Sequence, residues 1–177
     1  MQIESSRKLG LSANQTMRTA QKLYEGTEIK GETTGLITYM RTDSVVMSND
    51  AINQIRSFVT NNYGANYLPD SPRVYKSKAK NAQEAHECIR PTNINLTPKD
   101  IKQYITLEEY KLYEIIWQRA VSSQMASAIL DQVAVDITNE DKKIVLRANG
   151  STIKFPGMYK VYQEAKDDDK DEEKETI

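Results

Sequence analysis

Apolar side chains recur at helical spacing in several stretches of the chain, and each stretch begins at a residue that can cap a helix. In the first, Ser12 and Gln15 have the spacing of a capping box, and Gly26 is suited to end the helix. The second helix would begin at Ser48 and end before Gly64. Its apolar stripe comprises Ile52, Ile55, Val59 and Tyr63. Two amphipathic helices are therefore predicted between Ser12 and Gly64.

A third and longer helix is predicted to follow Thr106, which stands three residues before Glu109 in another capping-box pattern. A shorter helix is expected to begin at Thr97, because Pro98 is favoured in the first turn of a helix. The core contacts expected of the longer helix are Leu112, Ile115, Ile116 and Trp117. The first two thirds of the chain are therefore expected to be mainly helical.

The pattern changes to alternating apolar and polar residues after about residue 126. Residues 132–138 alternate in the way that is typical of a half-buried strand. Farther on, Asn149 and Gly150 lie between two extended stretches, and this pair predicts a hairpin that turns there. Among the helices, residues 36–39 form a short extended stretch that follows a polar connection, residues 27–35. The predicted fold class is therefore mainly α within an α+β arrangement.

Three regions follow from these elements. Residues 1–126 form a helical domain, residues 127–163 form a strand-rich part, and residues 164–177 form an acidic tail that is either disordered or the cut end of a longer chain. The eight acidic residues and three lysines of the tail contribute −5 to the formal net charge of −1, which leaves +4 on residues 1–163. This excess permits a polyanionic partner, although a solvated surface is the simpler explanation of the charge alone.

The composition excludes several classes of protein. A hydrophobic fraction of 38% with 28% charged residues fits a soluble protein, and no apolar run approaches membrane-spanning length. The N-terminus has no signal-peptide pattern. Cys88 is the only cysteine, which excludes an internal disulfide and a cysteine-based zinc site in this chain and fits a cytosolic location. No nucleotide-binding loop, metal-spaced carboxylate cluster or serine triad is present.

The sequence GLITYMRTDS, residues 35–44, leads from a short apolar stretch into closely spaced polar residues. If this stretch is extended, Tyr39 and Arg41 lie on the same face. A phenol is a weak nucleophile near neutral pH because its ordinary pKa is about 10, but a neighbouring guanidinium favours the phenolate and can hold a phosphate. Tyr39 is thus a candidate nucleophile for phosphoryl transfer, although most tyrosines at strand ends simply pack with the hydroxyl in water. The residues that could orient this pair through hydrogen bonds are Thr42, Asp43 and Ser44.

His86 is the only histidine, and it lies in a stretch predicted to form a short helix stopped by Pro91. On such a helix, Gln83 and Arg90 would lie about one turn to either side of His86. The three side chains would form a polar strip able to grip a phosphate and carry a proton-sharing imidazole. An exposed helix face with an incidental histidine is the simpler interpretation of these residues alone.

Taken together, GLITYMRTDS and AQEAHECIRPT, in this order and at this separation, resemble the bacterial type IA DNA topoisomerases. In that family the tyrosine of TYMRTDS attacks DNA, and the EAHE-IRP segment carries a histidine at the face that contacts DNA. Met40, directly after the tyrosine, is typical of the bacterial topoisomerase I branch. The stretches RKLGLSANQTMRTAQKLYEG and YKLYEIIWQRAVSSQMASA are also similar to the family, so the resemblance covers almost the whole chain.

The resemblance implies a fold and a domain organisation. The family's tyrosine domain is helix-turn-helix/winged-helix-like, and the antiparallel strands after it belong to the arch of the gate domain. The family's enzymes are several times longer than 177 residues. The chain is therefore expected to be an excised piece, with the tyrosine domain at residues 1–126 and part of the gate domain at residues 127–163.

The resemblance also implies roles for single residues. Tyr39 would attack a phosphodiester of single-stranded DNA and hold the 5′ end as a phosphotyrosine. Arg41 would position the scissile phosphate, and His86 would contact DNA and support the attack. Arg90 would be a phosphate contact and Asp43 an orienting group. The family relaxes negatively supercoiled DNA without ATP, because the protein–DNA bond conserves the energy of the broken bond.

Cofactors and partners follow from the same resemblance. Mg²⁺ is bound by the family's toprim domain, which has no counterpart in this sequence, so this piece alone is expected not to relax DNA. The expected partners are single-stranded or negatively supercoiled DNA and the toprim and remaining gate domains of the parent chain. No zinc and no membrane partner are expected, and the parent is expected in the cytoplasm at the nucleoid.

Two other functions remain open from the sequence. A non-catalytic winged-helix module would bind DNA without using Tyr39 as a nucleophile. A tyrosine recombinase would also combine tyrosine, histidine and arginine, but its tyrosine follows the histidine and arginine, whereas Tyr39 precedes His86. The DNA end that becomes attached distinguishes them, because recombinases retain a 3′ phosphate.

Overall fold

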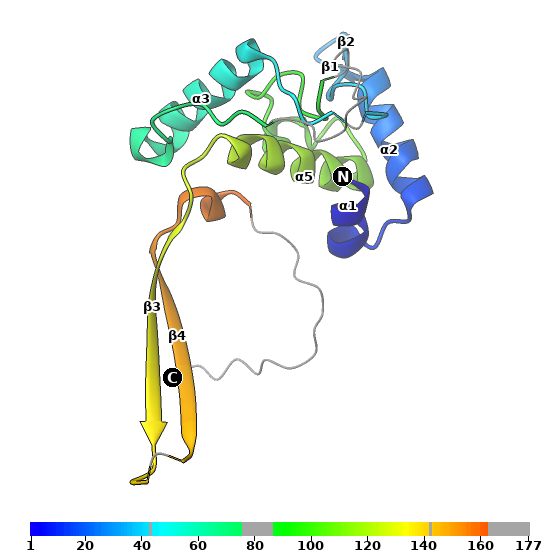
Figure 1. Ribbon diagram of the computed structural model, residues 1–177. Helices are drawn as coiled ribbons and strands as arrows, with labels where there is room; N and C mark the ends of the chain where they lie inside the picture. Colours follow the sequence, from blue (N-terminus) through cyan, green and yellow to red (C-terminus); the bar gives the residue numbers. More distant parts are fainter. Residues whose placement is uncertain (43, 76–86, 142, 163–177) are drawn as a thin grey trace.

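The computed structural model describes residues 1–42, 44–75, 87–141 and 143–162 of the chain. The helices pack into one body, and a long β-hairpin extends away from it (Figure 1). In chain order the described elements are α1 (Gln2–Leu9), α2 (Ala13–Glu25), β1 (Thr27–Ile29), β2 (Glu32–Thr34), α3 (Asn49–Tyr63), the 3-10 helix η1 (Ala65–Tyr67), α4 (Pro98–Ile101), α5 (Leu107–Ser123), β3 (Ile129–Thr138), β4 (Val145–Phe155) and the 3-10 helix η2 (Gly157–Lys160).

The helices begin at the capping residues that the sequence predicts. At the start of α2, the hydroxyl of Ser12 accepts a hydrogen bond from the N–H of Gln15, and the Gln15 side chain accepts one from the N–H of Ser12. The Ser48 side chain caps α3, and a capping box between Thr106 and Glu109 starts α5. Each cap satisfies backbone donors that have no partner inside the helix. The helices predicted to begin after Ser12, Ser48 and Thr106 are therefore confirmed.

Helix α5 forms the centre of the core and contacts α1, α2, α3 and α4. Its predicted core residues are all buried: Leu112, Ile115, Ile116 and Trp117. The indole N–H of Trp117 donates to the carbonyl of Ile94 over 2.9 Å, and the ring meets Phe58 of α3 edge-on at a centroid distance of 5.4 Å. The hydroxyl of Tyr113 donates to the carbonyl of Leu96 over 2.7 Å. Two buried aromatic side chains of α5 thus hydrogen-bond to the segment that precedes α4.

The polar connection expected at residues 27–35 is instead a small hairpin of β1 and β2. The strands pair antiparallel with Ile29 opposite Glu32, so that only Lys30 and Gly31 form the turn. Their φ values are +53° and +89°. Positive φ at both central residues is what a type I′ hairpin turn requires, and its twist matches that of the strands it joins. The Lys-Gly pair carries this signal less clearly than Asn-Gly or Asp-Gly.

The long hairpin turns at a different place from the one predicted. In the register of β3 and β4, Thr138 lies opposite Val145, so the chain turns between these two residues. Asn149 and Gly150 lie inside β4 and pair with residues of β3. The prediction that the chain turns at Asn149 and Gly150 was therefore wrong. A turn there would leave most of β3 unpaired, whereas the observed turn gives all ten residues of β3 a partner.

Local polar side chains stabilise the observed turn. The side-chain oxygen of Asn139 accepts a hydrogen bond from the N–H of Ile144 over 3.0 Å, and that of Asp141 accepts one from the N–H of Lys143 over 3.2 Å. Asparagine and aspartate favour turns because their side chains can replace backbone partners in this way. The turn is therefore specified by side-chain chemistry more than by a glycine.

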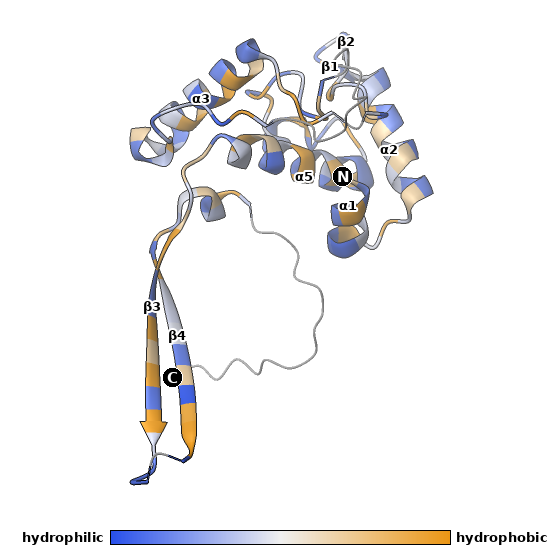
Figure 2. Cartoon of the chain, in the orientation of Figure 1, coloured by the Kyte–Doolittle hydropathy of each residue, from blue (hydrophilic) through white to orange (hydrophobic). Residues whose placement is uncertain are grey.

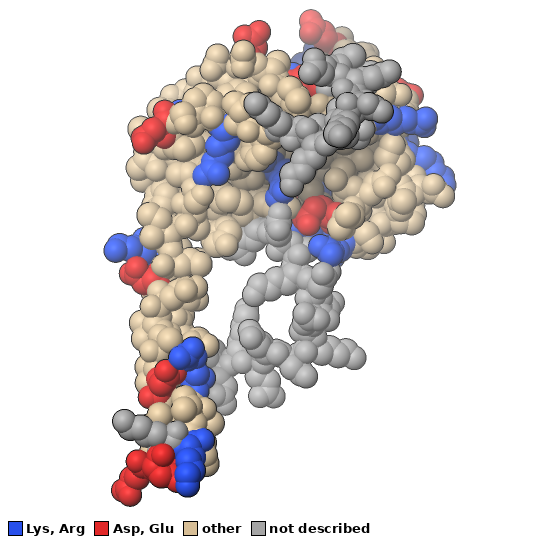
Figure 3. All heavy atoms as spheres, in the orientation of Figure 1, with Lys and Arg blue, Asp and Glu red and all other residues tan. Residues whose placement is uncertain are grey.

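Both faces of the long hairpin are exposed, whereas a half-buried strand was predicted. Every residue of β3 is exposed, and apolar and polar residues alternate along the ribbon (Figure 2). Across the strands, Arg147 donates two hydrogen bonds to Asp136, and charges of both signs gather toward the far end of the hairpin (Figure 3). The alternation of apolar and polar residues predicted strands correctly, but the prediction that one face would be buried was wrong.

The base of the hairpin is fixed to the helical body. Gly157 has φ +48°, and a Cβ at this position would lie 2.5 Å from the carbonyl oxygen of Ala126. The N–H of Met158 donates to the same carbonyl over 2.8 Å. Tyr162 is buried, and its hydroxyl donates to Glu4 of α1 over 2.8 Å. Residues after β4 thus return to the helices, although the division of the chain near residue 126 stays a prediction.

The described residues form five α-helices and two small antiparallel sheets, which agrees with the predicted α+β class. The winged-helix character of the tyrosine domain stays a prediction.

We expect Trp117→Phe to lower the free energy of unfolding by about 1–3 kcal/mol, because the buried carbonyl of Ile94 loses its donor. Urea unfolding followed by circular dichroism measures this change. The exposed Tyr159 provides the control, since Tyr159→Phe should change stability by less than about 0.5 kcal/mol. Equal stabilities for Trp117→Phe and the unmodified chain would show that the hydrogen bond contributes nothing.

Candidate active site

Tyr39 stands on a backbone segment whose neighbours are buried on both sides. Ile37 is 1% exposed and Met40 is 3% exposed, whereas Tyr39 itself is 42% exposed. The flanking apolar side chains anchor the backbone in the core, so the phenol ring is presented at the surface from a fixed point. This arrangement suits a side chain that must meet a large external substrate.

The segment before Tyr39 lies between the end of α2 and residues 90–92. The N–H of Leu36 donates to the carbonyl of Leu23 over 2.8 Å, and the carbonyl of Leu36 accepts from the N–H of Thr92 over 3.1 Å. Ile37 forms an isolated antiparallel bridge with Pro91. The predicted extended stretch is therefore reduced to a single bridge at Ile37, and the backbone bends at Thr38 and Met40.

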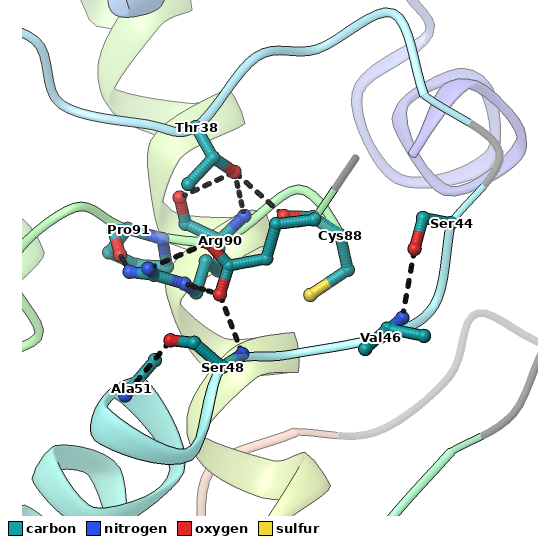
Figure 4. A network of polar contacts seen from close by, with 9 residues as sticks. Thr38, Ser44, Val46, Ser48, Ala51, Cys88, Arg90 and Pro91 are labelled. Carbon is teal, nitrogen blue, oxygen red and sulfur yellow. Dashed lines mark hydrogen bonds and ion pairs between the residues drawn. The ribbon is translucent and has the colours of Figure 1, made fainter. Parts of the chain in front are cut away.

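Thr38 joins this segment to the backbone of residues 88–90 (Figure 4). Its hydroxyl donates to the carbonyl of Cys88 over 2.7 Å and accepts from the N–H of Arg90 over 3.0 Å. Its own N–H donates to the carbonyl of Arg90 over 2.9 Å. The residue next to Tyr39 therefore has its hydroxyl and amide held by a segment fifty positions away in sequence.

An ion pair between Arg90 and Glu87 holds the segment that Thr38 contacts. Nε and Nη2 of Arg90 donate to the two carboxylate oxygens of Glu87 over 2.8 and 2.9 Å, and Nη1 donates to the carbonyl of Pro91. Glu87 also accepts the N–H of Ser48 over 2.8 Å, at the start of α3. Residues 87–91 thus connect the Tyr39 segment to α3. We call this set of contacts the Thr38–Glu87–Arg90 junction.

Opposing effects act on the pKa of Glu87. Burial raises it, but the hydrogen bonds from Arg90 and Ser48 outweigh burial and hold the pKa below its ordinary value of 4.5. By contrast, burial raises the pKa of the Cys88 thiol to about 11, with the neighbouring Glu87 carboxylate adding to the shift. Cys88 therefore stays a neutral thiol at physiological pH, and its contribution to the junction is its backbone.

The hydroxyl residues after Tyr39 shape the loop that leads to α3. The side chain of Thr42 accepts the N–H of Ser44 over 3.0 Å, and the side chain of Ser44 accepts the N–H of Val46 over 3.1 Å. The carbonyl of Val46 in turn accepts the N–H of Cys88. These hydroxyls were predicted to orient Tyr39 and Arg41, and what the structure shows is that they hydrogen-bond to their own backbone.

The predicted site residues have different positions in the structure. Arg41 is exposed and borders a surface pocket together with Met40 and Thr42. Asp43 and His86 lie outside the described residues. Arg90 is partly buried, and its guanidinium is engaged by Glu87 and Pro91. The roles of all five residues, including Tyr39, stay predictions.

The helix predicted before Pro91 is absent from its described part, residues 87–90. The expected helical strip therefore does not extend to Arg90. The physical reason is competition for the backbone, because Cys88 and Arg90 give their polar groups to Thr38 and Val46 and not to a helical turn.

The sequence interpretation missed three residues around Tyr39, namely Tyr24, Thr38 and Glu87. The ring of Tyr24 meets that of Tyr39 edge-on, with centroids 5.3 Å apart. Nothing in a single sequence shows that the end of α2 approaches residues 35–39, so only the structure could identify this contact.

Comparison with known proteins decides the family. A family model described as DNA topoisomerase matches residues 1–177. The chain belongs to the DNA topoisomerase family. The resemblance noted in the sequence is thus confirmed.

Individual relatives support this assignment. Proteins named DNA topoisomerase 1 from Rickettsia bellii and Xylella fastidiosa are 56% and 51% identical to this chain, over 100% and 94% of its length. The matches cover 22% and 20% of those proteins, so the chain spans about a fifth of their length. A solved structure of full-length topoisomerase I from Thermotoga maritima matches with a TM-score of 0.78 and 33% identity, covering 97% of this chain and 27% of that one.

Two features are absent from the described part of the chain, namely a metal-binding cluster and a membrane-spanning helix. No group of three or more histidine, cysteine, aspartate or glutamate side chains is placed to hold a metal ion among the residues that the structure describes. None of the helices described is both long enough and apolar enough to cross a bilayer.

We expect Glu87→Gln to lower the free energy of unfolding by about 1–3 kcal/mol at pH 7, because Arg90 loses its charged partner. The lowered pKa means that the carboxylate stabilises the fold above about pH 4.5, and that this contribution disappears as the pH falls through the folded-state pKa. The difference between the variant and the unmodified chain should therefore shrink toward pH 3.

Urea unfolding at pH 7, 5 and 3 measures this dependence. The matched control is Glu28→Gln, since Glu28 is an exposed glutamate on β1. It should leave stability within about 0.5 kcal/mol at each pH. A Glu87→Gln effect of the same size at pH 3 and pH 7 would show that the carboxylate charge is not what stabilises the junction.

Proposed function

We propose that this chain is the part of a bacterial type IA DNA topoisomerase that carries the nucleophile, Tyr39. The observation on which the proposal rests is the exposed phenol on a backbone that is anchored by buried neighbours and held by the Thr38–Glu87–Arg90 junction. The family assignment and the TYMRTDS motif support it. The substrate is one strand of DNA, and the parent works on negatively supercoiled DNA.

The reaction is a transesterification. The phenol oxygen of Tyr39 attacks a backbone phosphorus, the bond from phosphorus to the 3′ oxygen breaks, and the 5′ phosphate becomes bonded to the tyrosine. The phenol loses a proton and the departing 3′ oxygen gains one. Attack of that 3′ hydroxyl on the phosphotyrosine reverses each change and reseals the strand. One phosphoester replaces another at each step, so the cycle uses no ATP.

Arg41 is the group that would steady the phosphate. It is two residues from Tyr39 and exposed, so it is open to a DNA backbone. A guanidinium can donate two parallel hydrogen bonds to phosphate oxygens and stabilise charge that builds on them during attack. The proposed roles of His86 and Asp43 rest on the resemblance alone. For Arg90 to contact a phosphate it would have to share the guanidinium with Glu87 and Pro91.

Magnesium enters the proposal only through the toprim domain of the parent. The described residues of this chain offer no group that fits a metal ion, and no step above is assigned to one. The other proposed partners are the toprim and remaining gate domains. We place the parent in the cytoplasm at the nucleoid, where its substrate is.

The surface charge of this chain gives little indication of DNA binding. On the face shown in Figure 3, basic and acidic side chains are interspersed over the helical body. The net charge of +4 on residues 1–163 is correspondingly modest. We therefore expect the specificity for DNA to come from the chemistry at Tyr39 and from the rest of the parent.

We expect Tyr39→Phe in the full-length protein to abolish the covalent protein–DNA adduct, because the attacking oxygen is removed. The measurement uses a single-stranded oligonucleotide, Mg²⁺ and denaturant quenching, with separate labels on the two DNA ends. The control Tyr159→Phe, at an exposed tyrosine of η2, should form the adduct normally.

The labels also test the alternatives. A tyrosine attached to the 5′ end supports the topoisomerase reaction, and attachment to the 3′ end would indicate recombinase-type chemistry. Full adduct formation by Tyr39→Phe would favour a non-catalytic winged-helix module.

We expect Arg41→Ala to slow cleavage by about 10²- to 10³-fold, because the phosphate loses an oriented cation. Arg41→Lys should recover only part of this loss, since an ammonium cannot donate the two parallel hydrogen bonds. Single-turnover cleavage rates at saturating DNA provide the measurement. Arg18→Ala, at an exposed arginine of α2, is the control and should cleave at the normal rate. Equal rates for Arg41→Ala and Arg18→Ala would remove Arg41 from the proposed site.

A further inference from the structure

We propose that Tyr24 is a positioning residue that holds the ring of Tyr39 in the orientation needed for attack. The inference rests on the proposed role of Tyr39 as nucleophile and adds a residue that the motif does not contain. Tyr24 lies at the C-terminal end of α2, fifteen positions before Tyr39 in sequence. Three observations carry it: the ring contact, the fixed position of Tyr24, and its exposure.

The two rings meet edge-on. Their centroids are 5.3 Å apart and their planes are inclined at 68°. This geometry places the positive edge of one ring against the negative face of the other, which is the favoured arrangement of an aromatic pair. Rotation of the Tyr39 side chain to another rotamer would break the contact. The pair therefore favours one direction of the phenol oxygen.

The backbone of Tyr24 is itself fixed against the Tyr39 segment. Its neighbour Leu23 is fully buried and accepts the N–H of Leu36 over 2.8 Å. At Gly35, a Cβ would lie 2.8 Å from the carbonyl oxygen of Tyr24. Only a glycine permits this approach, so the end of α2 and the start of the Tyr39 segment meet backbone to backbone. The separation of the two backbones that carry the tyrosines is thus restrained by main-chain contacts.

The exposure of Tyr24 distinguishes this role from core packing. Tyr24 is 41% exposed and Tyr39 is 42% exposed, so the pair lies at the surface. The Thr38–Glu87–Arg90 junction fixes the backbone of Tyr39 but not the rotamer of an exposed ring. Reactions between bound groups depend steeply on orientation, and small misplacements slow them strongly. Tyr24 contacts the ring itself and so adds a restraint that backbone contacts cannot give.

The test compares Tyr24→Phe with Tyr24→Leu in the full-length protein. Phenylalanine keeps the ring, so cleavage at saturating single-stranded DNA should proceed at the normal rate. Leucine keeps apolar bulk but removes the ring, and it should slow both cleavage and resealing by roughly 3- to 10-fold, the range that one edge-on aromatic pair supports. The dissociation constant for DNA should be unchanged, and the melting temperature should fall by no more than a few degrees, because the lost aromatic pair also stabilises the folded state. Tyr159→Leu, at a tyrosine 40% exposed, is the matched control and should behave as the unmodified protein.

A second measurement reports on the ring directly. Fluorotyrosine placed at position 39 gives a ¹⁹F signal whose chemical shift depends on the adjacent Tyr24 ring. The signal should keep its shift in Tyr24→Phe and move in Tyr24→Leu. An unchanged shift in Tyr24→Leu would overturn the inference whether or not that variant is less stable.

Other outcomes are equally decisive. Weaker DNA binding by Tyr24→Leu with a normal rate at saturation would make Tyr24 a base-stacking contact and would contradict a positioning role. A normal rate and normal binding in Tyr24→Leu would also contradict a positioning role. The proposed function would still stand in that case, provided that Tyr39→Phe loses the adduct. Persistence of the adduct in Tyr39→Phe would remove both.

Discussion

The hydrogen bonds between Thr38 and the backbone of residues 88–90 are the contacts on which the arrangement around Tyr39 depends. They join two segments that are distant in sequence and that form no regular sheet together. Without them, the segment would keep the hydrogen bonds of Leu36 with Leu23 and Thr92, but the residue next to Tyr39 would lose the contacts that hold its hydroxyl and amide. The ion pair of Glu87 and Arg90 extends the same junction to α3. A largely helical body thus presents the exposed phenol of Tyr39 from a non-helical segment that is held by hydrogen bonds.

Local patterns predicted the helices well because caps and apolar stripes act within a few residues. Ser12, Ser48 and Thr106 specify where helices start by satisfying backbone donors beside them. Tyr39 could be proposed as a candidate nucleophile for a similar reason, since its motif is a continuous stretch. The contacts of Thr38 with Cys88, and of Tyr24 with Tyr39, could not be predicted, because they depend on how separate elements pack. The chain's assignment to its family came from motif and comparison, whereas the support of the site became visible only in three dimensions.

The two hairpins show the limit of turn rules. Asn149 and Gly150 are a strong local signal, yet pairing along the whole of β3 outweighs it and carries both residues into the middle of β4. Conversely, Lys30 adopts the positive φ that a tight turn needs although lysine gives little indication of it. In both hairpins the register between the strands decides where the chain reverses direction. The turn propensity of single residues is a weaker influence on that position.

The exposed ribbon of β3 and β4 has a practical consequence. Among the described residues each of these strands pairs only with the other, so each keeps one row of free N–H and C=O groups along its outer edge. Apolar side chains stand on both faces of the same ribbon, among them Val133, Leu146 and Ile153. An open edge beside apolar side chains is a template for strand addition between molecules. At high concentration, samples of this chain are therefore expected to associate through the ribbon, and charged substitutions at its apolar positions should reduce that association.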